Sequence, residues 1–176
     1  MSKFGRFLAA SVLAGACATS AMAENSFDYA FQGSLKGLDP YTLRETFTLG
    51  ILTNVYEGLI KRGPNLEILP GLATSWEVIE PTRWRFHLRK GVKFHNGNDF
   101  TAEDVVFSAE RLNSEGSDMK GRVPVDATFE IVDDHTVDVI LASPNPILHY
   151  EWELWSIIDK DWAETNDSVR VTSASD

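Results

Sequence analysis

Hydrophobic and polar residues alternate strictly from Trp84 to Arg89, with an aromatic or aliphatic side chain at every even position and Arg or His at every odd one. A period of two is typical of a strand with one buried and one solvated face. Asn96 and Gly97 follow, and both residue types tolerate the positive φ of a tight turn. The pattern therefore predicts a strand that leads into a turn.

A helix is predicted to begin directly after this turn, because the residues that start a helix are all present. Thr101 can accept hydrogen bonds from unpaired backbone N–H groups as the N-cap, and Asp104 occupies the position of the capping-box acid. Phe100 and Val105 are spaced to form a hydrophobic staple around the cap. We therefore expect a well-defined helix start at Thr101.

Short apolar segments on either side of turn residues predict three β-hairpins. Their paired segments are 59–61 with 66–69, 76–79 with 83–88, and 128–132 with 136–141. An earlier strand is predicted at Phe27–Phe31, where apolar and polar residues alternate. Strands joined mainly by hairpins, with isolated helices, indicate an α+β fold with a mostly antiparallel sheet and a few helices.

A further helix is predicted before the first hairpin, where Phe47, Ile51, Val55 and Leu59 recur at steps of four residues. Gly58 lies near its expected end and fits a helix C-cap.

The last part of the chain carries a weaker helical pattern. We predict a helix starting near Ile147 that carries Trp152 and Trp155. From Thr165 onward the apolar content and the periodicity are lost, so the tail is predicted to be disordered.

The N-terminus has the features of a signal peptide. Lys3 and Arg6 precede a short apolar stretch over 7–18, and Ala21-Met22-Ala23 is a small-x-small cleavage site. The apolar stretch is too short to span a bilayer, which takes about 20 residues. We therefore expect residues 1–23 to be removed after Ala23 and the mature chain to be periplasmic.

Cys17, the only cysteine, allows an alternative for this segment. Gly15-Ala16-Cys17 partly resembles a lipidation motif, although Ala14 stands where such motifs usually have a larger aliphatic residue. Cleavage after Ala23 is the favoured interpretation, and it would leave a mature chain without a thiol.

The charge balance excludes some classes of partner. Sixteen basic residues against 26 acidic ones give a formal net charge of −10. Nucleic acid and anionic membranes require a basic surface, so neither is an expected partner.

The residues that carry catalytic or metal chemistry show no suitable spacing. The four histidines lack the i, i+4 spacing of metal ligands, and no Gly-x-Ser-x-Gly motif occurs. We therefore expect no enzyme activity, no metal site and no cofactor. Four tryptophans could stack on sugars, but their apolar surroundings favour core packing; they are Trp76, Trp84, Trp152 and Trp155.

Four stretches, in this order along the chain, carry a family resemblance. They are Leu38-Asp39-Pro40, Val55-Tyr56-Glu57-Gly58-Leu59, Pro70-Gly71-Leu72-Ala73-Thr74-Ser75-Trp76, and the run 84–97 continued by 100–108. Together they resemble the signature region of the family 5 extracellular solute-binding proteins, which are peptide- and nickel-type receptors of ABC importers. Each motif alone is short, but their order and spacing make the resemblance specific.

The resemblance implies the N-terminal part of a type II periplasmic binding protein. Residues 24–58 would start the first ligand-binding lobe, 59–147 would form an inserted extra domain, and 148–176 would return toward the first lobe. Family members are much longer, so a truncated chain without its second lobe is expected. Such a chain is expected to bind peptide weakly, because closure of two lobes buries the ligand.

The function implied is that of a monomeric substrate-binding component of an ABC importer. Its partners would be a short peptide or similar small solute and the ABC permease subunits at the membrane. The alternative is a free-standing extracytoplasmic interaction module without a role in transport.

Candidate ligand-binding residues also follow from the resemblance. Ser34 and Leu35 follow the predicted first strand, at a position where such lobes expose groups to ligand. Arg44, Glu45 and Thr46 resemble the stretch that faces the ligand backbone in peptide-binding relatives. The alternative for these three residues is the solvated first turn of a helix.

Overall fold

The computed structural model describes residue 30 and residues 32–172. The chain divides into two units, 1–32 and 33–176, and the fold concerns the second unit. The predicted signal peptide over 1–23 lies outside the described residues, and the predicted strand over 27–31 lies there too except for Ala30.

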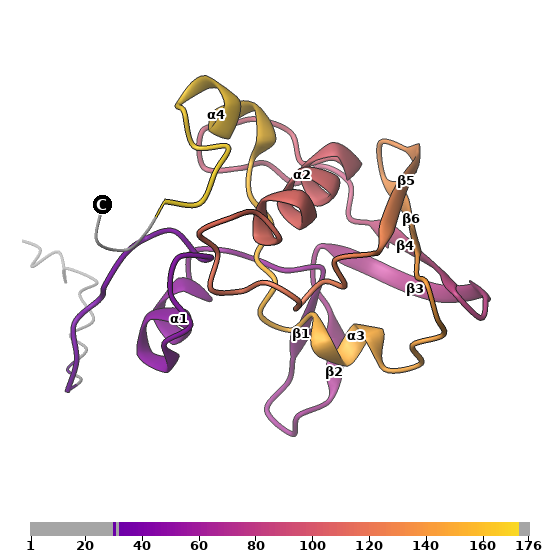
Figure 1. The fold of residues 1–176 in the computed structure, drawn as a ribbon, viewed down its shortest axis with the longest axis horizontal. Helices are drawn as coiled ribbons and strands as arrows, with labels where there is room; N and C mark the ends of the chain where they lie inside the picture. Colours follow the sequence, from indigo (N-terminus) through magenta and orange to yellow (C-terminus); the bar gives the residue numbers. More distant parts are fainter. Residues whose placement is uncertain (1–29, 31, 173–176) are drawn as a thin grey trace, which may run out of the picture. The chain divides into compact units, whose positions relative to one another are not determined.

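A four-stranded antiparallel sheet forms the centre of this unit, with the strand order β3-β4-β6-β5 (Figure 1). Two predicted hairpins are confirmed: β3 (Ala73–Glu80) with β4 (Arg83–Leu88), and β5 (Thr128–Asp133) with β6 (Thr136–Ile140). The pairing of β4 with β6 joins the two hairpins into one sheet.

The two faces of β4 follow the alternation seen in the sequence. Trp84, Phe86 and Leu88 are buried in the core, whereas the residues between them are half-buried. On the second face, the Nε atoms of Arg85 and Arg83 donate to the Asp138 carboxylate over 2.6 and 2.8 Å. The Asp138 carboxylate is buried and is therefore paired with arginines, as a buried charge requires.

Helix α2 (Ala102–Leu112) begins as predicted. Its Asp104 carboxylate accepts a hydrogen bond from Thr101 N over 2.8 Å, and Thr101 Oγ1 accepts one from Glu103 N over 3.3 Å. The helix contacts β5, β6 and α4, which places it beside the sheet (Figure 1). The capping box thus starts a helix that covers the core.

The remaining predicted hairpin forms a separate two-stranded sheet of β1 (Ile60–Arg62) and β2 (Ile68–Pro70). Gly71 N and Ala73 N donate to Leu59 O, so the chain passes closely from this small sheet into β3.

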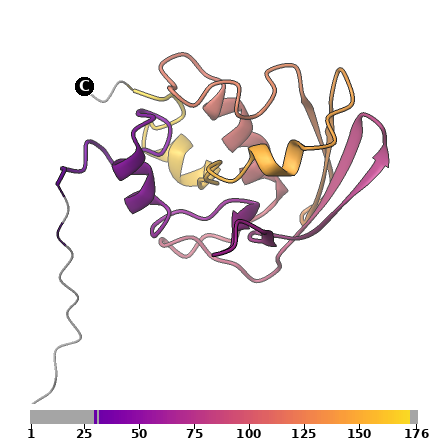
Figure 2. The ribbon, with the colours of Figure 1, turned by 90° about the horizontal axis from the view of Figure 1, so that it is seen from below.

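Helix α1 (Thr46–Leu52) is shorter than the periodicity predicts. The prediction of a helix that continues to a cap at Gly58 is wrong, because Gly58 pairs with Ser156 in an isolated β-bridge. A Cβ added at Gly58 would lie 2.7 Å from Trp155 O. The glycine therefore permits close backbone approach instead of ending a helix. Figure 2 shows α1 at the opposite end of the unit from the tip of the β3–β4 hairpin.

Two short helices replace the single one predicted after Ile147. They are α3 (Leu148–Glu151) and α4 (Lys160–Thr165), and Trp155 lies between them. Asp159 caps α4 by accepting a hydrogen bond from Trp162 N over 3.0 Å. The sequence analysis missed α4.

The tail is better packed than the sequence analysis expected. Val171 is buried, and Arg111 Nε donates to Ser168 O over 2.8 Å. Gly116, at φ +91°, lies directly against Val171, since an added Cβ would be 2.5 Å from Val171 O. The expected disorder is therefore not observed over residues 165–172.

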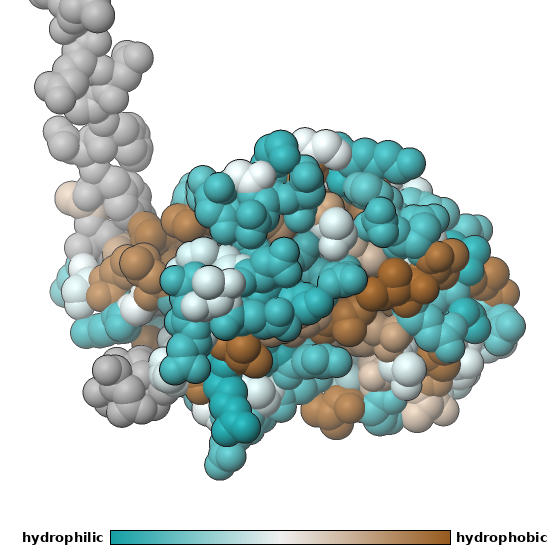
Figure 3. Space-filling view, turned by 90° about the horizontal axis from the view of Figure 1, so that it is seen from above, coloured by the Kyte–Doolittle hydropathy of each residue, from teal (hydrophilic) through white to brown (hydrophobic). Residues whose placement is uncertain are grey.

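The face of the molecule that Figure 3 shows is mostly polar. Figure 3 shows hydrophobic side chains in separate patches on a largely hydrophilic face. Within residues 30 and 32–172, no helix is long and apolar enough to cross a membrane.

Candidate ligand-binding site

The segment before α1, which carries the predicted ligand-binding residues other than Thr46, is held by Asp39. Its Oδ1 accepts a hydrogen bond from Tyr41 N over 3.0 Å and another from Arg111 Nη1 over 2.9 Å. Its Oδ2 accepts from Arg111 Nη2 over 2.5 Å. This bidentate ion pair ties the Leu38-Asp39-Pro40 turn to the end of α2.

Tyr41 anchors the same segment in the core. Its side chain is fully buried, and its hydroxyl donates to Ser156 O. The Arg111 guanidinium lies 5.4 Å from the ring centroid, which is within range of a cation–π contact. Burial raises the pKa of the Tyr41 hydroxyl far above its ordinary value, so the phenol stays neutral and keeps its donor.

Glu45 has a local structural partner. Its carboxylate accepts hydrogen bonds from Phe47 N over 2.9 Å and from Thr48 N over 2.8 Å, as the N-cap of α1. The backbone hydrogen bonds from Thr48 and Phe47 hold the pKa of Glu45 below its usual range. For this residue the structure supports the alternative of a helix first turn.

The other predicted ligand-binding residues are exposed: Ser34, Leu35, Arg44 and Thr46. Arg44 lines a pocket of about 260 Å³ together with residues 119–122 and Glu151. The structure does not bring Ser34 or Leu35 into this pocket.

Arg122 is the half-buried cation of the Arg44 pocket. Its Nη1 donates to the backbone oxygen of Glu151 over 3.0 Å. Burial, and after it the charge of Arg44, lower the pKa of Arg122. Sequence reasoning missed Arg122, because nothing in the local pattern links it to Arg44.

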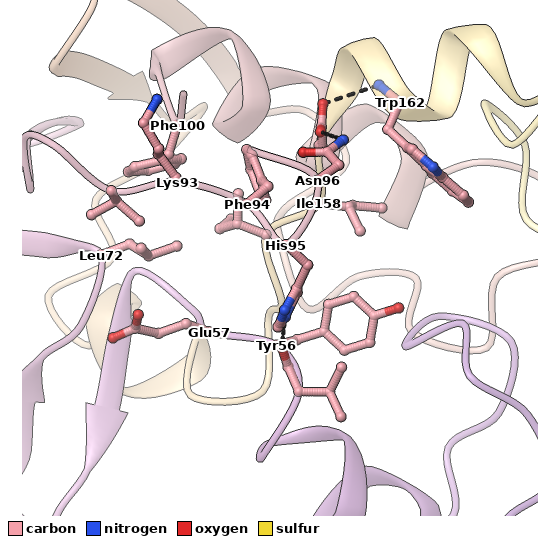
Figure 4. Close-up of a pocket in the computed structure, with 14 residues that line it drawn as sticks. Tyr56, Glu57, Leu72, Lys93, Phe94, His95, Asn96, Phe100, Ile158 and Trp162 are labelled. Atoms are coloured by element: carbon pink, nitrogen blue, oxygen red, sulfur yellow. Dashed lines mark hydrogen bonds between the residues drawn. The ribbon is translucent and has the colours of Figure 1, made fainter. Parts of the chain in front are cut away.

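A second and larger pocket, of about 340 Å³, lies beyond the end of α1 (Figure 4). Its walls come from the segment after α1, the loop before α2 and the segment that enters α4. Most of the lining is apolar, from Leu72, Val92, Phe94, Phe100, Ile157 and Ile158.

The polar residues around the larger pocket already have partners within the chain, including Arg89 for Glu57 and Asp99 for Lys93. Asp159 Oδ2 accepts hydrogen bonds from Asn96 Nδ2 over 2.7 Å and from Asn98 Nδ2 over 2.9 Å, and His95 Nε2 lies 3.2 Å from Val55 O. These contacts fix the loop and leave an apolar hollow. The hollow suits van der Waals contact with an apolar group.

The tryptophans considered for sugar stacking are core residues, as favoured from the sequence. Trp84, Trp152 and Trp155 are buried, and Trp76 is partly buried against the core. Trp162, which sequence reasoning passed over, is about half exposed (49%) and lines the larger pocket.

Metal-ligating side chains do not converge in the part of the chain that the structure describes, where no group of three His, Cys, Asp or Glu could hold an ion. His87 lies 3.3 Å from the Glu77 carboxylate on the outer face of the sheet. His149 Nδ1 is buried without a hydrogen-bond partner among the described residues, and burial lowers the pKa of His149.

Comparison with known proteins gives a consistent result. The family described as bacterial extracellular solute-binding proteins, family 5 (middle), matches residues 67–171. The dipeptide-binding protein of Escherichia coli K12 is 32% identical over 161 residues, which cover 77% of this chain and 30% of that protein. The periplasmic oligopeptide-binding protein OppA of the same strain is 30% identical over 134 residues, covering 65% of this chain and 25% of that protein.

Solved structures share the fold as well. The ABC transporter-associated periplasmic binding protein DppA of Helicobacter pylori, solved with the peptide STSA, superposes with a TM-score of 0.63. It is 29% identical, and the match covers 75% of this chain and 31% of that one. The chain thus spans less than a third of the length of the relatives that it matches.

Proposed function

The chain belongs to the bacterial extracellular solute-binding proteins of family 5, and on this basis we propose that it serves an ABC importer by binding a short peptide or a similar small solute. The role is to bind and present a solute and involves no catalytic step. ATP hydrolysis would belong to partner subunits, because no phosphate-cradling Gly-x-x-x-x-Gly-Lys motif occurs in the sequence.

The family match is the observation that carries the proposal. The family match over 67–171 coincides with the sheet, α2 and α4, and two relatives that match are named for binding peptides. The segment before α1 is fixed to this unit by the Asp39–Arg111 ion pair and the buried Tyr41 ring. Arg44 and Thr46 are exposed beside those anchors. A firmly held segment with exposed polar groups is what a ligand contact requires.

We propose that three segments of the chain belong to different parts of the receptor. Residues 24–58 would belong to the first ligand-binding lobe, 59–147 to the extra domain, and 148–176 would return toward the first lobe. The solute would lie against residues 34–46, and further parts of a family 5 receptor would cover it. Binding by the 176-residue chain on its own is then weak, since one face buries a small part of a ligand.

The proposed location is the periplasm, after cleavage of a signal peptide behind Ala23. The natural partner there would be the external face of the permease. The chain would act there as a monomer.

Photoaffinity labelling tests this proposal, since it detects weak binding. Di- to tetrapeptides that carry a benzophenone group would be irradiated with the 176-residue chain, and labelled residues would be mapped by mass spectrometry. We expect labelling at residues 34–46 that an excess of unlabelled peptide suppresses. Labelling that is spread over the surface and resists competition would overturn the proposal.

A further inference from the structure

The pocket beside Arg44 contains three basic side chains, those of Arg44, Lys120 and Arg122. Within the described residues, none of the three forms an ion pair with a carboxylate. All other arginines of the described residues except Arg170 are paired with acids: Arg62, Arg83, Arg85, Arg89 and Arg111. In a chain with a formal net charge of −10, this gathering of cations without a bonded carboxylate is unusual.

The acid at the pocket rim is engaged elsewhere. Glu151 lines the pocket, but its Oε2 accepts a hydrogen bond from Asn145 Nδ2 over 2.8 Å. Only its backbone oxygen accepts from Arg122. Glu153, the next acid along the chain, accepts from Arg62 Nε over 2.6 Å. The charge of the three cations is therefore not neutralised by a bonded carboxylate from the described residues.

The loop that supplies Lys120 and Arg122 is held in place. Met119 is buried, and its N donates to Ser117 Oγ over 3.1 Å. Gly121 N donates to Asn113 Oδ1 over 3.2 Å. A fixed loop positions the guanidinium before a ligand arrives, which reduces the entropic cost of binding.

Arg122 would also gain from an added anion. It is half-buried, so its charge has lost part of its hydration; this burial and the charge of Arg44 lower the pKa of Arg122, and the nearby Glu153 and Glu151 offset them only in part. An anion between the two guanidinium groups would offset both effects. Guanidinium groups bind carboxylate and phosphate oxygens in a bidentate manner.

We infer that the pocket of Arg44, Lys120 and Arg122 binds an oxyanion, either a carboxylate or a phosphate group, so that the natural solute carries such a group. This inference rests on the proposed function, since Arg44 belongs to the segment proposed to face the solute. It adds the class of solute, which the resemblance to peptide receptors leaves open.

The test is an NMR titration of the ¹⁵N-labelled 176-residue chain at constant ionic strength. The probes are succinate, inorganic phosphate and, as an uncharged analogue, succinamide. We expect saturable shifts of the amide signals of residues 119–122 with succinate or phosphate, and none with succinamide. The stronger of the two anions identifies the carboxylate or the phosphate as the favoured group.

Substitutions assign the effect to the pocket. Arg122→Gln and Arg44→Gln each remove charge-assisted hydrogen bonds and are expected to weaken anion binding about tenfold. Lys120→Gln changes an exposed residue and provides a variant whose fold is not at risk. Arg170→Gln is the matched control, because Arg170 is exposed, has no ion pair within the described residues and lies outside the pocket.

Absent or non-saturable shifts would overturn the inference, as would equal weakening in Arg170→Gln. Photolabelling separates this result from a failure of the proposed function. If a neutral peptide and its C-terminal amide, which lacks the carboxylate, label residues 34–46 equally, the anion inference fails while the proposed function stands. If anion binding is saturable but unlabelled peptide does not suppress the photolabelling, the proposed function fails while the anion inference stands.

Discussion

Asp39 and Arg111 are 72 positions apart in the sequence and form a bidentate ion pair, with N–O distances of 2.9 and 2.5 Å. The Arg111 side chain is only 6% exposed and also donates to the backbone oxygens of Ser168 and Arg170. One guanidinium thus joins the segment before α1, helix α2 and the tail. Much of the order around the proposed binding segment depends on it.

Removal of this guanidinium should destabilise the fold. Arg111→Met leaves two backbone oxygens without this donor and Asp39 with only the hydrogen bond from Tyr41 N, and we expect a loss of about 3 kcal/mol in the free energy of unfolding. Urea denaturation followed by circular dichroism measures it. Glu153→Gln, which breaks the more exposed Arg62–Glu153 pair, should cost less than about 1 kcal/mol. Equal losses in both variants would contradict the central position of Arg111.

The acid sensitivity of the sheet should depend on Asp138. Hydrogen bonds from Arg85 and Arg83 hold the pKa of the Asp138 carboxyl below its ordinary 3.8, and its side chain is fully buried. A depressed pKa in the folded state means that the unfolded state takes up the proton first. The stability from this group is therefore present above the unfolded pKa and lost as the pH falls through the folded one.

Urea denaturation between neutral pH and about pH 2 tests this dependence. Asp138→Asn should be less stable at neutral pH and should lose less stability on acidification than the unmodified chain. Glu130→Gln, which removes an exposed partner of Arg83, should keep the original pH dependence. Parallel pH profiles for Asp138→Asn and the unmodified chain would argue against the proposed linkage.

Two glycines should respond in opposite directions to alanine. Gly58→Ala places a Cβ 2.7 Å from Trp155 O, so we expect a loss of about 1–3 kcal/mol from overpacking. Gly50→Ala lies in α1 with no atom within 4 Å of the new Cβ and should add about 0.5–1 kcal/mol. Thermal unfolding of the two variants gives the comparison. A neutral Gly58→Ala would mean that the chain does not approach Trp155 so closely.

The capping box of α2 should contribute measurably. Thr101→Ala removes the acceptor for Glu103 N, and the expected loss is about 1 kcal/mol. Thr101→Ser keeps an oxygen in that position and should stay close to the original stability. Chemical denaturation of both variants checks the prediction, which an unchanged Thr101→Ala would refute.

Local signals explain which parts of the fold could be predicted. The hairpins and α2 follow from alternation, turn residues and a capping box, all of which act within a few residues. The end of α1 depends instead on Gly58 meeting the backbone at Trp155 and Ser156, far along the chain. The burial of Val171 likewise depends on a distant glycine, Gly116.

The candidate site also combines residues that the sequence could suggest with residues that only the folded chain brings together. The family resemblance predicts Arg44 as a ligand-binding residue, but its neighbours Lys120 and Arg122 come from a loop that no local pattern connects to it. The resemblance also predicts Glu45, whose carboxylate caps α1. Only the folded chain shows which charges meet and which are already paired.

Calorimetric titration with a dipeptide tests most directly whether this chain supplies one side of a shared binding site. The samples are the 176-residue chain and a chimera in which its residues 33–172 replace the aligned region of the E. coli dipeptide-binding protein. We predict a Kd above about 1 mM for the chain alone and a micromolar Kd for the chimera. Micromolar binding by the chain alone, or a cooperatively folded chimera that does not bind, would contradict the account.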